Sequence, residues 1–169
     1  MTMREAVERS RGHIEKCEPS FGARVGRWYG ELMSKKIPVL IYCSVRTPQE
    51  QEELYAKGRT KPGVKVTNAR GIPPQSLHID QGKGSHAIDY VPLARTPISG
   101  EFVASWDDDT TYGITRKIAE KHGLRGLDWE QPHLEDANIS GWRELVSPQK
   151  QVVNNKKISL VNKRPWSSR

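Results

Sequence analysis

The chain has 169 residues, of which 35% are hydrophobic and 28% are charged, a composition that excludes a wholly disordered or fibrous protein and favours one domain. The formal net charge of +7 favours polyanionic partners such as nucleic acid, anionic lipid or acidic cell-wall polymers, although solubility alone also accounts for it. The positive excess lies at the end, where residues 149–169 hold six Lys or Arg and no acid. We therefore predict a folded domain over residues 1–147 and a basic tail over 148–169. A charged tail is weak evidence for sequence-specific DNA binding, which needs a basic face on the folded body.

The first half of the chain predicts three helices and a strand. Residues 3–16 indicate a polar helix, and residues 21–35 an amphipathic helix with Ser20 as its N-cap. Residues 37–43 are a continuous β-rich run, typical of a buried strand. Thr47 as N-cap, Pro48 in the first turn and Glu50 at the third position predict a helix that stops at Gly58. The core residues expected on the second helix are Phe21, Val25, Trp28, Tyr29 and Leu32.

The second half predicts fewer regular elements. Residues 59–75 form a loop around a short predicted strand at 64–67, and further strands are predicted at 87–91 and 102–104. Acidic residues 107–109 start a helix that runs to about His122 and ends at Gly123. Its expected inward-facing residues are Tyr112, Ile114, Ile118 and Ala119. Residues 124–134 are a short aromatic and acidic segment. The elements together predict an α+β fold with a small, mostly antiparallel sheet flanked by helices in a single domain.

Apolar segments and cysteines are the sequence features that indicate a cellular compartment. No apolar run approaches the length of a membrane span, and the charged first eleven residues lack the apolar stretch of a signal peptide. The chain has two cysteines, Cys17 and Cys43. Without a secretory signal, we expect free, buried thiols rather than a disulfide.

Three of the five histidines stand out as candidates for chemistry. His13 and His122 lie in polar helices, where a histidine is usually structural or solvated. In contrast, His78, His86 and His133 lie beside carboxylates in loops or at strand ends. A catalytic zinc commonly takes three protein ligands from His, Asp and Glu and keeps its fourth position for water. A separate carboxylate then serves as general base and acid. Spacing alone indicates such a site only weakly, because His and carboxylate pairs are common.

Six segments, taken in their order along the chain, resemble a known set of motifs. They are residues 44–51 (SVRTPQEQ), 54–63 (LYAKGRTKPG), 66–69 (VTNA), 76–78 (SLH), 87–89 (AID) and 130–133 (EQPH). The set resembles the phage-type zinc peptidases of the D-alanyl-D-alanine carboxypeptidase and L-alanyl-D-glutamate endopeptidase family, which include phage endolysins. The resemblance covers about residues 10–136 and depends on the order of the motifs rather than on any one of them.

The resemblance implies a role for each matching residue. It implies Zn²⁺ as cofactor, with His78, Asp89 and His133 as its ligands and Glu130 as the catalytic acid and base. Arg46 falls on the family's arginine, which steadies the scissile carbonyl and its oxyanion. A guanidinium suits that role because it stays protonated and presents a fixed fork of donors. Gln51 falls on the glutamine of the same segment, where we expect packing and local hydrogen bonding.

One spacing departs from the family's pattern. His78 and Asp89 are eleven residues apart where the family has seven, and the extra residues are Gly-rich and polar. His86 is therefore a competing ligand. We favour His78, because His86 and Asp89 are three apart on a predicted strand and would point to opposite faces. The alternative carboxylates, Asp80 and Asp128, are expected to be solvated or bonded to nearby backbone.

The implied reaction is hydrolysis of an amide bond in the peptidoglycan stem peptide, with L-alanyl–D-glutamate as the expected bond. A D-alanyl-D-alanine carboxypeptidase would use the same zinc set, but the missing export signal argues against it. An endolysin without a signal would collect in the host cytoplasm and reach the wall from the periplasmic side after a pore opens the inner membrane. We expect a monomer, with the basic tail binding anionic envelope polymers. A non-enzymatic nucleic-acid-binding protein would explain the charge but not the His, Asp and Glu set.

Overall fold

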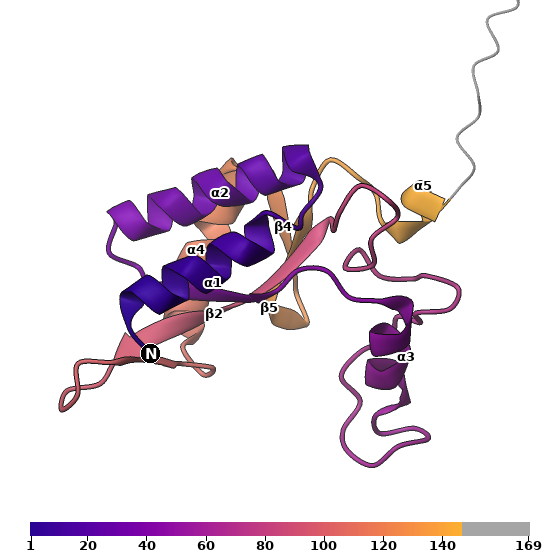
Figure 1. Ribbon diagram of the computed structural model, residues 1–169, viewed down its shortest axis with the longest axis horizontal. Helices are drawn as coiled ribbons and strands as arrows, with labels where there is room; N and C mark the ends of the chain where they lie inside the picture. Colours follow the sequence, from indigo (N-terminus) through magenta and orange to yellow (C-terminus); the bar gives the residue numbers. More distant parts are fainter. Residues whose placement is uncertain (147–169) are drawn as a thin grey trace, which may run out of the picture.

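A five-stranded antiparallel sheet forms the centre of the protein, and helices flank it (Figure 1). The structure is a computed structural model that describes residues 1–146, so the predicted basic tail lies outside the described residues. The elements in chain order are α1 (Met3–Ile14), α2 (Pro19–Ser34), β1 (Val39–Cys43), α3 (Pro48–Ala56), β2 (Ala87–Arg95), β3 (Phe102–Ala104), α4 (Asp109–Lys121), β4 (Leu124–Leu127), β5 (Glu130–Asp136) and α5 (Trp142–Val146). This arrangement confirms the predicted α+β domain.

The register of the sheet already places two of the predicted site residues together. The strand order is β1-β2-β5-β4, and β3 pairs with the end of β2. Helix α1 packs along the edge strand β1, where Ser10 Oγ accepts a hydrogen bond from Ile41 N at 3.0 Å. In the antiparallel pair of β2 and β5, Asp89 lies directly opposite His133. Backbone pairing alone therefore makes neighbours of two residues that are 44 positions apart in the sequence.

One apolar cluster joins the sheet to α2 and α4. The five apolar residues predicted to face the core from α2 are all buried: Phe21, Val25, Trp28, Tyr29 and Leu32. In the sheet, Ile88 and Tyr90 of β2 and Leu134 of β5 belong to the same cluster. Successive side chains of a strand point to opposite faces, so Asp89 and His133 point away from α2 and α4. The candidate site therefore lies on the other face of the sheet.

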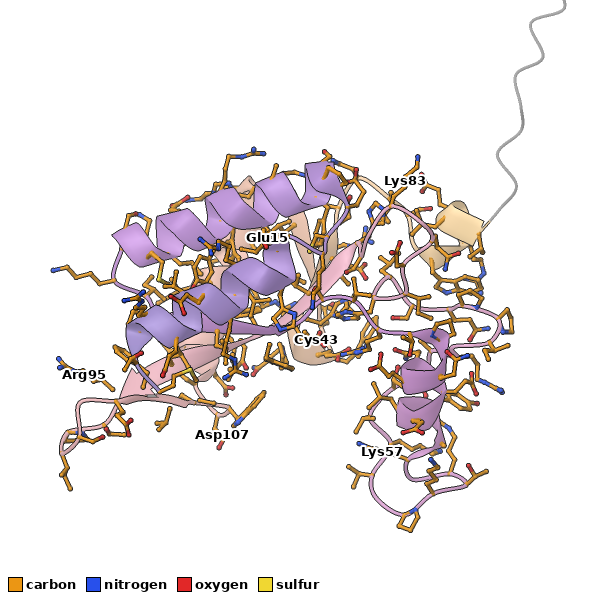
Figure 2. The ribbon with its side chains drawn as sticks, in the orientation of Figure 1. Glu15, Cys43, Lys57, Lys83, Arg95 and Asp107 are labelled. Carbon is orange, nitrogen blue, oxygen red and sulfur yellow. The ribbon has the colours of Figure 1, made fainter. Side chains whose placement is uncertain are left out.

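A separate lobe around α3 stands beside that face. The chain leaves the sheet near Cys43 at the end of β1, builds the lobe that carries Lys57, and returns to the sheet at β2 (Figure 2). Two guanidinium groups stack on the Tyr55 ring of this lobe, Arg59 at 4.0 Å and Arg70 at 4.7 Å from the ring centroid. Such cation–π contacts help to fix the loop that follows α3.

The starts of two helices test the capping predictions. Thr47 caps α3 as predicted, because its side chain accepts from Glu50 N while the Glu50 carboxylate accepts from Thr47 N. For α2 the predicted N-cap, Ser20, is wrong. The helix begins at Pro19, and the Glu18 carboxylate accepts a hydrogen bond from Phe21 N at 2.8 Å. Proline fits the first helical position, so the cap is the residue before it.

Three other expectations need correction. The strand predicted at 64–67 is absent, because side chains rather than a neighbouring strand bond this segment: Arg59 donates to Thr67 O at 3.0 Å. Residues 124–134, for which the sequence predicts no helix or strand, contain β4 and most of β5. Ile114 was expected to face the core but is 45% exposed, and Thr115 is buried in α4 instead. The Thr115 hydroxyl lies 2.7 Å from the Tyr90 hydroxyl, a bond that satisfies both groups inside the core.

The state of the two cysteines agrees with the prediction from the sequence. Cys17 and Cys43 are free, and Cys17 is buried while Cys43 is partly buried. Among residues 1–146, no helix combines the length and the apolar character that crossing a membrane requires.

Candidate metal centre

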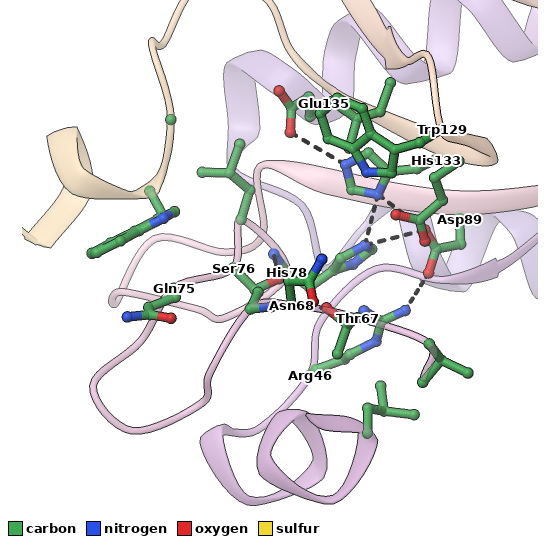
Figure 3. Close-up of a pocket in the computed structure, with 18 of the residues that line it drawn as sticks. Arg46, Thr67, Asn68, Gln75, Ser76, His78, Asp89, Trp129, His133 and Glu135 are labelled. Atoms are coloured by element: carbon green, nitrogen blue, oxygen red, sulfur yellow. Dashed lines mark hydrogen bonds and ion pairs between the residues drawn. The ribbon is translucent and has the colours of Figure 1, made fainter. Parts of the chain in front are cut away.

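Three predicted ligand side chains meet on the face of the sheet opposite α2 and α4 (Figure 3). Asp89 comes from β2 and His133 from β5, while His78 comes from the loop before β2. The His78 segment is tied to the sheet by backbone bonds from Arg46 N to His78 O and from His86 N to Leu77 O, both 2.9 Å. All three side chains are buried.

Their facing atoms form a nearly equilateral triangle. Asp89 Oδ1 lies 3.2 Å from His78 Nε2 and 3.2 Å from His133 Nδ1, and the two nitrogens lie 3.3 Å apart. A tetrahedral zinc ion with N and O ligands at 2.0–2.1 Å separates neighbouring ligand atoms by about 3.3–3.4 Å. Two imidazole nitrogens and a carboxylate oxygen are also ligands that zinc prefers. Both the spacing and the donor set therefore fit a zinc ion.

Neighbouring acceptors orient both imidazole rings. His78 Nδ1 lies 2.6 Å from the Ser44 carbonyl oxygen and donates to it, so His78 Nε2 faces the triangle. His133 Nε2 lies 3.3 Å from Glu135 Oε2 and donates to it, so His133 Nδ1 faces the triangle. Glu135 is itself held by Arg125, whose Nε donates to Glu135 Oε1 at 2.9 Å. A carboxylate behind a ligand histidine fixes the ring's tautomer and direction.

Charges around the triangle shift two pKa values. Burial alone would lower the pKa of His133, but hydrogen bonds to Asp89 and Glu135 outweigh it and raise that pKa to about 9. Burial opposes ionisation of Asp89 as well, yet the charge of His78, hydrogen bonds from both histidines and the charge of Arg46 hold its pKa well below its ordinary value. The site is thus arranged to hold positive charge between these side chains, and a metal ion would replace the proton on His133.

Glu130 stands beside the triangle without being part of it. A Glu130 carboxylate oxygen lies within 4.8 Å of a carboxylate oxygen of Asp89 and a ring nitrogen of His133. Glu130 is the first residue of β5 and pairs with Leu127 of β4, so its backbone is fixed by the sheet. Within residues 1–146, its carboxylate makes no hydrogen bond or ion pair and is therefore available to exchange a proton with a bound molecule.

Arg46 holds the outer oxygen of Asp89. Its Nη2 pairs with Asp89 Oδ2, which leaves Oδ1 directed at the two histidines. Its Nη1 donates to Gln51 Oε1 at 3.4 Å, and the buried Gln51 donates in turn to Ala69 O at 3.0 Å. Gln51 thus packs and bonds locally, as the sequence suggests. Arg46 therefore lies in the site, where its guanidinium contacts both Asp89 and Gln51.

The competing histidine lies in a different cluster. His86 Nδ1 is 3.2 Å from Asp136 Oδ2, and Arg24 Nη2 donates to the same oxygen at 2.7 Å. Glu18 offers a third possible ligand atom there. The Arg24 guanidinium already supplies the positive charge that a cation would bring, so this cluster is a buried salt bridge rather than a second metal site. The structure places His78, and not His86, beside Asp89.

The extra residues between His78 and Asp89 form a compact loop held by its own hydrogen bonds. The Asp80 carboxylate accepts from Gly82 N at 2.6 Å and from Gly84 N at 2.7 Å, the backbone bonding expected of it. Gly84 has a φ of +98°, and a Cβ there would lie 2.5 Å from the carbonyl carbon of Cys17. Only glycine fits this close approach. The insertion therefore reaches the junction of α1 and α2 and returns without disturbing the triangle.

A cavity of about 850 Å³ opens over the triangle. The loop after α3 contributes Lys65 and Thr67 to its lining, the β4–β5 turn contributes Trp129, and α5 contributes Trp142. Cys43 Sγ lies within 4.8 Å of ligand atoms of His78 and Asp89, but burial raises the pKa of this thiol and favours its neutral form, a poor zinc ligand. The cavity is large enough for a ligand the size of a short peptide.

Sequence reasoning missed two supports of the site. Glu135 and the Ser44 carbonyl set the directions of His133 and His78, but Glu135 lies outside the motif segments and a backbone carbonyl leaves no residue-type signal. The position of Glu135 carries one signal: it is two residues after His133 and so shares its face of a strand. That signal is usable only once residues 130–136 are known to be a strand.

Comparison with known proteins adds no relative, because no protein-family model and no curated protein match the chain. A function for this site therefore has to follow from its geometry and its motifs.

Replacing Glu135 by glutamine is expected to weaken zinc binding by about tenfold, the low end of the effect of such outer partners. Glutamine keeps a hydrogen-bond acceptor for His133 but removes the negative charge that raises the ring's basicity. Zinc titration against a competing chelator measures the change. Glu120→Gln, an exposed carboxylate of α4, is the matched control. Equal zinc affinity of Glu135→Gln, Glu120→Gln and the parent protein would show that Glu135 does not support zinc binding.

Proposed function

We propose that this protein is a zinc-dependent peptidase that hydrolyses an amide bond of the peptidoglycan stem peptide, with L-alanyl–D-glutamate as the bond. The triangle of His78, Asp89 and His133, with a Glu130 carboxylate beside it that has no ion pair within residues 1–146, carries this proposal. Three protein ligands and an open cavity are typical of a catalytic zinc site, whereas structural sites have four protein ligands. The order of the motifs supports the substrate class through the resemblance described above.

Each proposed residue has a defined task. When bound, zinc would polarise the substrate carbonyl and make a water molecule more acidic. Glu130 takes the proton from the attacking water and returns it to the nitrogen of the leaving amine. Its carboxylate suits this exchange because it has no ion pair in the described part of the chain. The cavity wall of the α3 lobe then positions the peptide over the triangle.

Arg46 is proposed to act in two ways. Its pairing with Asp89 Oδ2 keeps Oδ1 on the metal side, and its remaining N–H groups stabilise the oxyanion as the carbonyl is attacked. Arg46→Lys keeps the charge but loses the fork, so we expect kcat to fall by about 10- to 100-fold. Steady-state hydrolysis of a soluble muropeptide measures this, with zinc content checked by elemental analysis. An unchanged kcat would show that neither contact matters to the reaction.

Digestion of purified sacculi followed by mass spectrometry tests the function. Cleavage of the L-alanyl–D-glutamate bond would leave a single L-alanine on the sugar's lactyl group and release peptides with a new glutamate amino group. Loss of a terminal D-alanine alone would identify the carboxypeptidase alternative. Intact stem peptides after incubation with the zinc-loaded protein would overturn the proposal.

A further inference from the structure

The side chain of Trp129 is 81% exposed at the edge of the cavity. Within residues 1–146 its indole makes no hydrogen bond and no ring contact, whereas the partly exposed Trp106 packs edge-to-face against Tyr42 and the Arg143 guanidinium lies 4.5 Å from the ring centroid of Trp142. Trp129 and His133 line the same cavity (Figure 3). A large aromatic side chain left in water beside a cavity contributes little to folding, and such side chains are enriched where a ligand binds.

The backbone holds Trp129 in a fixed place. Asp128 and Trp129 form the two-residue turn between β4 and β5, and the residues on either side, Leu127 and Glu130, pair with each other. Arg116 Nη2 donates to Leu127 O at 2.8 Å and ties this turn to α4. Because Trp129 and Glu130 are consecutive, their Cα atoms are about 3.8 Å apart. Both residues line the cavity, so a group bound by the indole shares that cavity with the bond at which Glu130 acts.

The chemistry of peptidoglycan narrows what the indole can bind. The stem peptide carries methyl, carboxylate and amine groups, none of which offers a broad apolar face. The pyranose rings of the glycan do offer one, since the axial C–H groups at C1, C3 and C5 of a ring with equatorial substituents point to the same face.

On the basis of the proposed function, we infer that Trp129 is the stacking platform for the N-acetylated sugar ring to which the stem peptide is attached. This contact directs hydrolysis to the L-alanyl–D-glutamate amide, close to the glycan, rather than to the far end of the stem peptide. The L-alanyl–D-glutamate bond is one residue from the sugar's lactyl group. The terminal D-alanyl–D-alanine bond lies at least about 10 Å further along an extended chain. A sugar on Trp129 therefore places the first bond, and not the second, beside Glu130.

The test compares two substrates with the same peptide. One is a disaccharide-linked muropeptide, and the other is the sugar-free peptide with an acetyl group on its L-alanine. The measured quantity is the ratio of the two kcat/KM values for the parent protein, Trp129→Ala, Trp129→Phe and Ile98→Ala. Ile98 is fully exposed on the β2–β3 connection, outside the cavity, and serves as the control.

The parent protein is expected to prefer the glycan-linked substrate by about tenfold, in line with the strength of one aromatic contact. Trp129→Ala should bring this ratio close to one, while Trp129→Phe and Ile98→Ala should keep most of it. If Trp129→Ala lowers both kcat/KM values and leaves the ratio unchanged, the indole only supports Glu130 and the inference fails. A ratio near one in the parent protein also overturns it. If the parent protein cleaves neither substrate, the proposed function fails as well.

An independent readout uses binding without turnover. In the Glu130→Gln protein, stacking on the indole should shift the sugar ring protons of the muropeptide upfield in the proton NMR spectrum. The shift should disappear when Trp129→Ala is added. Equal shifts in the two proteins would assign the contact to another side chain and overturn the inference.

Discussion

Replacing His78, Asp89 or His133 by alanine is expected to abolish both zinc binding and hydrolysis. Each residue supplies one corner of a triangle whose sides are 3.2–3.3 Å, so each replacement leaves two ligands and a weak site. Elemental analysis after dialysis measures bound zinc, and hydrolysis of a soluble muropeptide measures activity. Circular dichroism establishes that each variant is folded.

His86→Ala is the matched control for these variants. His86 bonds Asp136 in a separate cluster, so this variant should keep one zinc per chain even if its stability falls. Loss of zinc from His86→Ala together with retention by His78→Ala would contradict the proposed ligand set.

Replacing Glu130 by glutamine should keep the fold and the zinc but reduce turnover by about 10²- to 10⁴-fold, the usual contribution of a general base. Glutamine has almost the same shape and cannot take up the proton of the attacking water. The Glu130 carboxylate makes no hydrogen bond within residues 1–146, so the substitution disturbs no internal contact. The comparison is kcat at equal zinc content.

Asp128→Asn provides the control for that experiment. Asp128 is an exposed carboxylate two residues away on the same turn, and its replacement should leave kcat within about twofold. Full activity of Glu130→Gln would exclude Glu130 as the acid and base. A loss of kcat in both variants would indicate that the conformation of the β4–β5 turn, and not the Glu130 carboxylate alone, determines turnover.

The parts of the fold that follow local rules could be predicted from the sequence. The α3 start follows from Thr47, Pro48 and Glu50, whose capping contacts involve neighbours in the chain. Strand β5 could not be predicted, because Leu134 is its only strongly apolar residue and Pro132 interrupts it. His133 and Glu135 are polar because they build the site, and Asp136 is polar because it pairs with Arg24. A functional strand therefore lacks the alternation that identifies an ordinary one.

The site itself could be predicted only in part. Motif order places His78, Asp89 and His133 together, although spacing alone is weak evidence for contacts across such long stretches of chain. The pairing of Arg46 with Asp89 joins residues 43 apart and depends on where the lobe around α3 leaves β1. The Glu135 contact with His133 depends on a strand that the sequence does not indicate. Contacts of this kind arise from tertiary structure and leave no local pattern.

The central claim is that one zinc ion, held by His78, Asp89 and His133, is required for hydrolysis. The most direct measurement removes bound metal with a chelator, returns zinc in fractions of an equivalent, and records muropeptide hydrolysis at each step. We expect no hydrolysis without metal and a linear recovery that levels off at one zinc per chain. Hydrolysis at the full rate by the metal-free protein would contradict the account.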